Sequence, residues 1–183
     1  MLTREQIEAF KDIEPTRVIR NGQAYTETSE FLTSELTRHV AAYRKMTKST
    51  QLGRLTRDKI DDSIRRYHDY VIAGKYKAHY RQVGVLSKKN NVFEHVIPIR
   101  TVRSMLIAVV ITIEQALNSP TCLITPEKNK ILGELKLTKS TPNAWWFWQR
   151  YQALDLQIET WDSVAVDQST WNLESHYNYF IKV

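Results

Sequence analysis

The sequence predicts an α+β fold that is predominantly helical. Glycine and proline are scarce, at five residues each, which disfavours an all-β architecture. Apolar residues recur at three- and four-residue steps in several long segments, as expected for one side of a helix. Shorter β-branched segments bounded by proline or asparagine are typical of strands. We expect an amino-terminal helical module, followed by a unit of two strands and a helix with one further helix inserted.

The amino-terminal half carries helix signals only. Thr3 and Gln6 have the spacing of a capping box, which predicts a short helix directly after Thr3. Apolar spacing predicts a longer helix from Thr28 or Ser29 to about Met46, and Thr56 is expected to cap the next one. The polar segment 87–91 is the best candidate for a linker between two units. The expected division is a helical module 1–88 and a second unit 89–183, with one domain 1–183 as the alternative.

The second half alternates between strand and helix signals. Residues 92–98 and 121–125 are short and β-branched, which predicts two strands, and 99–117 has helical spacing. Thr125-Pro126 starts a helix, with threonine as N-cap and proline in the first turn. Thr141-Pro142 repeats this signal and predicts a helix bearing Trp145–Trp148. Residues 156–161 alternate, which predicts a last strand.

Composition narrows the class of protein. The net charge of +6 and a pI near 9.4 favour polyanionic partners, of which nucleic acid is the commonest in a cell. The single cysteine, Cys122, excludes an intramolecular disulfide and indicates a reducing compartment. No signal peptide is visible, and the longest apolar stretch is far shorter than the roughly 20 residues that span a bilayer. We therefore expect a soluble cytoplasmic protein with no membrane partner.

Glu94 and His95 are the residues whose context points to chemistry. They lie on a predicted strand that ends at Pro98, and a second strand and a proline-started helix with Asn129 follow. A histidine can deprotonate water for attack on a phosphodiester, and oxygen ligands suit Mg²⁺ or Mn²⁺. Neighbouring strand residues point to opposite faces, so both reach one site only if the strand ends or bulges there.

The segments 94–98 and 123–130 resemble the HNH endonuclease family, whose fold is a ββα-metal unit. The resemblance covers about 40 residues and implies a phage or restriction-type DNA endonuclease, located in the host cytoplasm if phage-encoded. It implies His95 as general base, with Glu94 and Asn129 holding a divalent ion, Mg²⁺ or Mn²⁺. The middle asparagine of the family motif has no match, since Asn118 lies too early. RNA stays open as a substrate.

Each of these residues also has a structural interpretation. His95 would then cap the end of a strand, Glu94 would be solvated, and Asn129 would be an ordinary surface residue of its helix. Glu127 suits the first turn of that helix and is the substitute ligand if Asn129 is not one. Glu134-x-Lys136 has the spacing of another nuclease class, but a solvated helix end is the better interpretation.

Several basic residues flank the proposed site and are candidates for phosphate contacts. The expected nucleic-acid-binding residues are Lys88, Lys89, Arg100, Arg103, Lys128 and Lys130. Arg65-Arg66 adds to this basic character. The alternative is a solvated surface, because Asp58, Asp61 and Asp62 stand at helical spacing from the basic residues of the segment 54–66.

The remaining features point to packing or to partners. Four consecutive aromatic residues, Trp145 to Trp148, predict core packing or a homodimer interface. Cys122 is expected to be buried, and His39, His68, His79 and His176 lie apart without ligand spacing. Two other functions therefore remain beside the endonuclease: a non-catalytic basic nucleic-acid-binding or regulatory protein, and a helical protein-interaction module.

Overall fold

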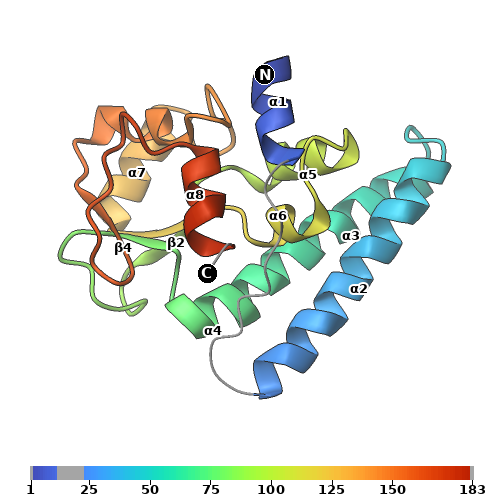
Figure 1. The fold of residues 1–183 in the computed structure, drawn as a ribbon, viewed down its shortest axis with the longest axis horizontal. Helices are drawn as coiled ribbons and strands as arrows, with labels where there is room; N and C mark the ends of the chain where they lie inside the picture. Colours follow the sequence, from blue (N-terminus) through green and yellow to red (C-terminus); the bar gives the residue numbers. More distant parts are fainter. Residues whose placement is uncertain (1, 12–22, 182–183) are drawn as a thin grey trace.

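A hairpin of two long helices lies beside a small mixed sheet in the computed structural model, which describes residues 2–11 and 23–181 (Figure 1). The hairpin consists of α2 (Gln23–Lys45) and α3 (Gln51–Tyr67). α3 continues through a π-helical turn, η1 (His68–Ile72), into α4 (Ala73–Tyr76). A short helix, α1 (Arg4–Lys11), precedes them, and Thr3 and Gln6 form the expected capping box in front of it.

The start of α3 differs from the prediction. Thr56 does not cap this helix; Thr50 does, its hydroxyl accepting a hydrogen bond from the amide of Gly53 at 3.1 Å. A Cβ atom at Gly53 would lie 2.8 Å from the carbonyl oxygens of Thr47 and Lys48, so only glycine lets the tight connection from α2 close here. Thr50 and Gln51, in the segment expected to be a connection, therefore already belong to the cap and to the helix.

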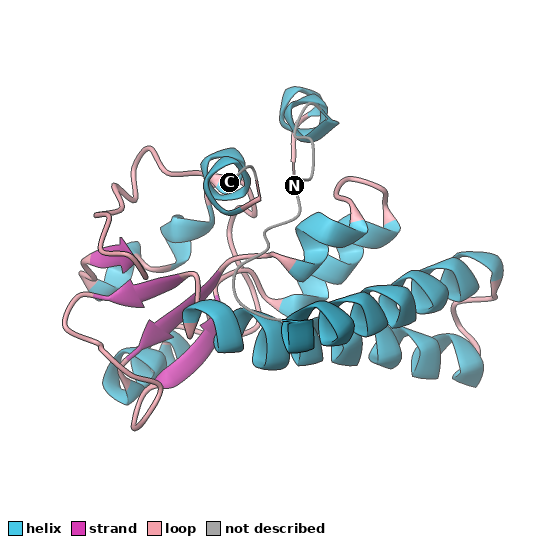
Figure 2. Ribbon diagram, turned by 60° about the horizontal axis from the view of Figure 1, so that its bottom comes forward, coloured by secondary structure: helices cyan, strands magenta, loops and turns pink. Residues whose placement is uncertain are grey.

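The strands of the described residues form one sheet of order β2-β3-β1-β4 (Figure 2). β1 (Tyr80–Gln82) runs parallel to β3 (Thr121–Ile124), whereas β2 (Val92–His95) and β4 (Ile158–Thr160) are antiparallel to their neighbours. The expected strands correspond to β2, β3 and β4. β1 was not expected, and it lies inside the sheet although its residues precede the predicted linker.

In the sequence, the inserted helical segment lies between β2 and β3. α7 (Pro126–Glu134) follows β3 directly, with Thr125 as its N-cap. The single helix expected over 99–117 is wrong. It is divided into α5 (Ile99–Ile107) and α6 (Ile113–Leu117). Val109, two residues after the end of α5, has a φ of 59°, and Thr112 starts α6 through a capping box with Gln115. A left-handed residue and a new cap together interrupt the periodic apolar pattern.

The carboxy-terminal part holds the other difference. The segment directly after Thr141-Pro142 does not form the expected α-helix. Asn143 Oδ1 accepts hydrogen bonds from the amides of Trp145 and Trp146, and the chain then forms the 3₁₀ helices η2 (Phe147–Arg150) and η3 (Gln152–Leu154). After β4, the chain ends in α8 (Leu173–Phe180). The asparagine side chain thus replaces the helical cap that Thr141 was expected to supply.

The two faces of the sheet have different surroundings. We call the face bearing Glu94, Cys122 and Tyr80 the inner face, because Cys122 and Tyr80 belong to the main hydrophobic core. The outer face bears a row of neighbours across all four strands, namely Phe93, Leu123, Arg81 and Glu159. Leu123 belongs to a separate small cluster on that face. The sheet thus divides side chains that are adjacent in sequence between two environments.

The main core is shared by the two expected units. It includes Leu36 and Ile64 from the helical hairpin and Trp148 and Tyr177 from the carboxy-terminal part. The division at residue 88 stays a prediction, although one sheet and one core receive residues from both sides of it. Cys122 is fully buried, as expected. Among the helices described, none has the length and apolar character needed to cross a bilayer.

Candidate functional site

Glu94 and His95 lie on opposite faces of β2. Glu94 is the register partner of Cys122, and His95 is the partner of Thr121 on β3. The His95 ring lies 5.7 Å from the ring of Phe93, two residues earlier on the same face. β2 is therefore regular at this point, and the two side chains do not converge.

Arg150 binds the end of β2 on its inner side. Its guanidinium is fully buried and donates to Glu94 Oε1 at 2.5 Å, to the carbonyl oxygen of His95 at 2.7 Å and to that of Val96 at 2.8 Å. Burial raises the pKa of Glu94, and the charge of Arg150 opposes this shift. Sequence reasoning missed Arg150, because no local pattern pairs it with a residue so distant along the chain.

His95 is a neutral imidazole in a positive environment. Burial, together with the charges of Arg65, Arg150 and Lys88, lowers its pKa to about 4. Its Nε2 atom is buried without a hydrogen-bond partner among the described residues. On the other side, the ring of His68 lies 5.1 Å away. The side chain is thus in the form that accepts a proton, with one nitrogen unengaged.

His95 also belongs to a cluster of buried histidines that the sequence did not indicate. His68 Nε2 lies 3.4 Å from Ser119 Oγ, and His79 Nδ1 lies 2.9 Å from Thr121 Oγ1. The rings of His79 and His176 are 4.9 Å apart. All these histidines lie near the segment that leads into β3, although they come from η1, β2, α8 and the position just before β1.

The protonation of His176 follows from its partners. Its Nε2 lies 2.6 Å from the carbonyl oxygen of Asn118, which can only accept, so Nε2 carries the proton. Nδ1 therefore accepts from the hydroxyl of Tyr80 at 2.8 Å, and this hydroxyl accepts from the indole N–H of Trp171 at 2.8 Å. Both nitrogens are used, so the neutral ring is part of the packing.

Asn129 lies on the helix that packs beside β2, the strand that bears Glu94. Its helix, α7, contacts β2 and η3, and Leu132 of α7 is buried in the main core. Asn129 is half-buried there, whereas His95 is on the outer side of the sheet. Glu94 is bound to Arg150, and no group of three or more histidine, cysteine or acidic side chains in the described residues is placed to hold a metal ion. In this arrangement the expected ligands and base do not fit around one ion.

The expected phosphate-binding residues on α5 and α7 have varied surroundings. Arg100 is exposed, but Arg103 is buried and forms an ion pair with Asp61 at 2.5 Å. Lys128 Nζ donates to the carbonyl oxygen of Leu154 at 2.7 Å, and exposed Lys130 lies 3.8 Å from Glu134. Of these residues, Arg103 contributes to the packing of α5 against α3, whereas Arg100 and Lys130 have solvated charges.

Lys88 and Lys89 lie in the loop before β2, and both are exposed. Lys88 Nζ is 4.7 Å from the centre of the Phe93 ring and 3.8 Å from Asp69. At the opposite edge of the sheet, Lys77 Nζ and Arg81 Cζ each lie 4.8 Å from the centre of the Trp161 ring. The outer face therefore combines two aromatic rings with several cations, which no single stretch of sequence indicates.

The tryptophan segment is mainly part of the core. Trp145 is 6% exposed, Phe147 and Trp148 are fully buried, and Trp146 is half-buried. Trp148 packs edge-on against Tyr80 on β1, at a ring distance of 5.0 Å. The packing interpretation is confirmed for these side chains, and the homodimer through Trp145–Trp148 stays a prediction.

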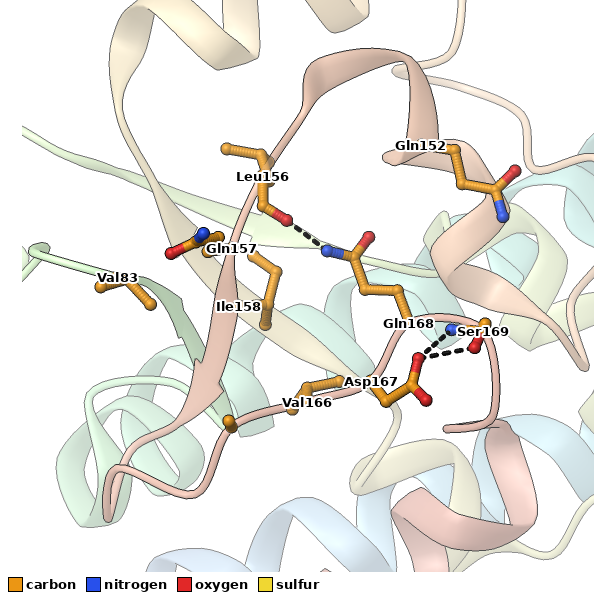
Figure 3. Close-up of a pocket in the computed structure, with 10 residues that line it drawn as sticks. Val83, Gln152, Leu156, Gln157, Ile158, Val166, Asp167, Gln168 and Ser169 are labelled. Carbon is orange, nitrogen blue, oxygen red and sulfur yellow. Dashed lines mark hydrogen bonds between the residues drawn. The ribbon is translucent and has the colours of Figure 1, made fainter.

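A separate cavity of about 500 Å³ lies beside β4. Its walls include Leu156, Ile158 and Val166, and the amide of Gln168 donates to the carbonyl oxygen of Leu156 (Figure 3). Asp167 accepts hydrogen bonds from the amide and hydroxyl of Ser169. None of the site residues expected from the sequence lines this cavity. In comparisons with known proteins, the chain matches no family model, no curated protein and no solved structure.

Proposed function

We propose that this protein is a cytoplasmic nucleic-acid-binding protein, and that phosphates are held near the end of β2. The observation that carries the proposal is that three cations from separate elements lie near enough to His95 for their charges to lower its pKa: Arg65 of α3, Lys88 of the loop before β2, and Arg150 of η2. They come from distant parts of the chain. A site that concentrates like charges from separate elements attracts polyanions.

The exposed members of this group are suited to bind phosphate. Arg65 and Lys89 are exposed, and Lys88 contacts the ring of Phe93 and forms a solvated ion pair with Asp69 at 3.8 Å. Exposed pairs of this kind contribute about 0 to 1 kcal/mol, so a phosphate can displace the carboxylate at little cost. Arg150 is buried and keeps the end of β2 in place. The net charge of +6 supports the same partner class.

The test is the salt dependence of binding to a labelled DNA duplex and to a labelled single strand, followed by anisotropy. We compare wild type with the combined Arg65→Gln, Lys88→Gln and Lys89→Gln variant. A matched variant removes three cations at the distant end of the helical hairpin: Lys45→Gln, Lys48→Gln and Arg54→Gln (Figure 1). We expect the first variant to flatten the slope of log affinity against log salt by about 2 to 3 units. Equal slopes for both variants would contradict the proposal.

Metal-dependent cleavage of DNA, with His95 as base, is the second candidate function. Two observations favour it: the order β2, β3, α7, with β2 and β3 antiparallel, and the neutral His95 ring with its unpartnered Nε2. It requires a rearrangement, because Glu94 is bound to Arg150 and His95 faces the other side of the sheet. We therefore rank DNA cleavage second to nucleic-acid binding as the proposed function.

Plasmid cleavage with Mg²⁺ or Mn²⁺ separates the candidates. Wild type is compared with His95→Ala and with His39→Ala, which alters the half-buried histidine of α2. Cleavage lost only in His95→Ala supports the nuclease, and cleavage retained there removes His95 as the base. Binding without cleavage supports the binding protein. If neither occurs, the protein-interaction module is the remaining candidate.

A further inference from the structure

We propose that the nucleic acid is bound as a single strand, with unpaired bases stacking on Phe93 and Trp161 across the outer face of the sheet. This inference rests on the proposed nucleic-acid binding and specifies its substrate class. The residues that carry it lie apart from the Glu94–Arg150 ion pair. They form a surface of two aromatic rings, each accompanied by cations.

The two rings share one face and one support. Phe93 is in the row that continues through Leu123 and Arg81 to Glu159, and Trp161 is two residues after Glu159, on the same face. Both rings pack against the small cluster formed by Ala78, Val85 and Leu123, and both stay partly exposed. The supporting cluster fixes the rings while leaving part of each accessible.

Each ring has a cation that is free to exchange a ring contact for a phosphate contact. Lys88 and Lys77 are exposed and lie 4.7 Å and 4.8 Å from the ring centres of Phe93 and Trp161. Arg81 differs, because Glu159 holds its Nε at 2.7 Å and so keeps it beside the ring. A base that stacks on the ring therefore brings its phosphate to an ammonium group already present. This complementarity favours a nucleic acid over an uncharged partner.

The spacing of the rings favours unpaired bases. Phe93 and Glu159 lie at opposite edges of the sheet, three interstrand steps of about 4.8 Å apart, and Trp161 is two residues beyond Glu159. The backbone positions of Phe93 and Trp161 are therefore separated by roughly 16 Å. Consecutive bases in a duplex strand are stacked about 3.4 Å apart. Their flat surfaces are covered by neighbouring bases and are unavailable to protein rings. Only a strand with splayed bases can contact both rings, as in single-strand binding surfaces.

The experiment compares binding of a labelled oligothymidylate with binding of its duplex, at one salt concentration. The variants are Phe93→Leu and Trp161→Leu, which keep an apolar side chain against the supporting cluster. Phe31→Leu, at an exposed position of α2, is the matched control. We expect each outer-face variant to weaken single-strand binding about 5- to 150-fold, the range for loss of one stacked base. Duplex affinity should be unchanged.

Two further variants test whether weaker binding comes from loss of folding. Phe93→Tyr and Trp161→Phe keep a ring at each position, and we expect them to retain single-strand affinity. Single-strand binding should also quench part of the tryptophan fluorescence, and this part should be missing in Trp161→Leu. Quenching that is unchanged in Trp161→Leu would overturn the assignment of this ring.

The outcomes distinguish this inference from the proposed function. Equal binding of single strand and duplex, unaffected by the leucine variants, would overturn the inference and leave the nucleic-acid function standing. Absence of binding to either oligonucleotide would overturn both. Binding to anionic phospholipid vesicles without binding to oligonucleotides would also overturn both, and would indicate a membrane surface as the partner.

Discussion

Arg150 and Glu94 form an ion pair at 2.5 Å, in which the arginine is fully buried and the carboxylate is 14% exposed. The same guanidinium binds the carbonyl oxygens of His95 and Val96 at the end of β2, which is an edge strand. An edge strand leaves backbone groups unpaired. Arg150 therefore completes this edge with a side chain, and Glu94 balances its charge.

Removal of Arg150 should be strongly destabilising. Arg150→Met leaves the buried carboxylate of Glu94 and two carbonyl groups without a donor, and we expect a loss of about 3 to 5 kcal/mol in the free energy of unfolding. Urea denaturation measures it. Arg38→Met is the control, because Arg38 forms an exposed ion pair with Glu35, worth at most about 0.5 kcal/mol. Similar losses in the two variants would contradict a structural role for Arg150.

Arg100 and Arg103 should separate stability from binding. Both are on α5, but Arg103 is buried against Asp61 of α3, whereas Arg100 is exposed. Arg103→Met leaves Asp61 uncompensated and should lower the free energy of unfolding by about 3 kcal/mol. Arg100→Met should leave stability within about 0.5 kcal/mol. If Arg100 contacts phosphate, its variant alone should reduce DNA affinity, measured by anisotropy under conditions where both variants are folded.

Val109 offers a stabilising substitution. The amides of Val109 and Val110 donate to the carbonyl oxygens of Leu106 and Met105, the pattern of a helix end with a left-handed residue. A left-handed conformation costs about 1 to 2 kcal/mol for a side chain with a Cβ. Glycine avoids this cost but is more flexible when unfolded, by about 0.5 to 1 kcal/mol.

We therefore expect Val109→Gly to raise the free energy of unfolding by up to about 1 kcal/mol. Ala108→Gly is the matched control, since Ala108 has a φ of −76° and gains nothing from glycine. It should destabilise by about 0.5 to 1 kcal/mol. Thermal denaturation of both variants tests the argument, and a destabilised Val109→Gly protein would refute it.

Local signals predicted the elements that local contacts determine. The caps at Thr3 and Thr125 were correct, because each depends on residues within one turn of the chain. β2 and β3 were also expected from their β-branched composition. β1 was not, because three residues carry no recognisable period and this strand forms only between β3 and β4. The tryptophan segment failed similarly, since burial against Tyr80 outweighs its helix signal.

The candidate site divides in the same manner. The sequence correctly located Glu94 and His95 on a strand, and strand geometry already placed adjacent residues on opposite faces. Arg150 pairs with Glu94 although 56 residues separate them in the sequence. Similarly, Trp161 and Phe93 share one face only because the sheet connects the strands at its two edges. The buried histidines likewise share no spacing. Pairing between residues so far apart leaves no pattern in the sequence from which it could be predicted.

The buried histidines should make the protein sensitive to acid. Burial lowers the pKa of His68 and His79 well below the usual value, that of His95 to about 4 and that of His176 to about 3. In the unfolded chain each pKa is about 6.5. Below that pH the unfolded state binds more protons, so the stability present at neutral pH is lost as the pH falls. Glu94 acts in the opposite sense, because its raised pKa favours protonation in the folded state.

We therefore expect the free energy of unfolding to fall steeply between about pH 6 and pH 4.5, by up to about 1.4 kcal/mol per pH unit for each buried histidine. His95→Gln and His176→Gln should each reduce this slope by about one such increment, whatever they cost at neutral pH. His39→Gln should change it less, because His39 is more solvated and its pKa is only lowered from the usual value. Urea denaturation across this pH range measures all the slopes. A wild-type slope matched by His176→Gln would mean that this ring accepts a proton without disturbing its bonds to Tyr80 and Asn118.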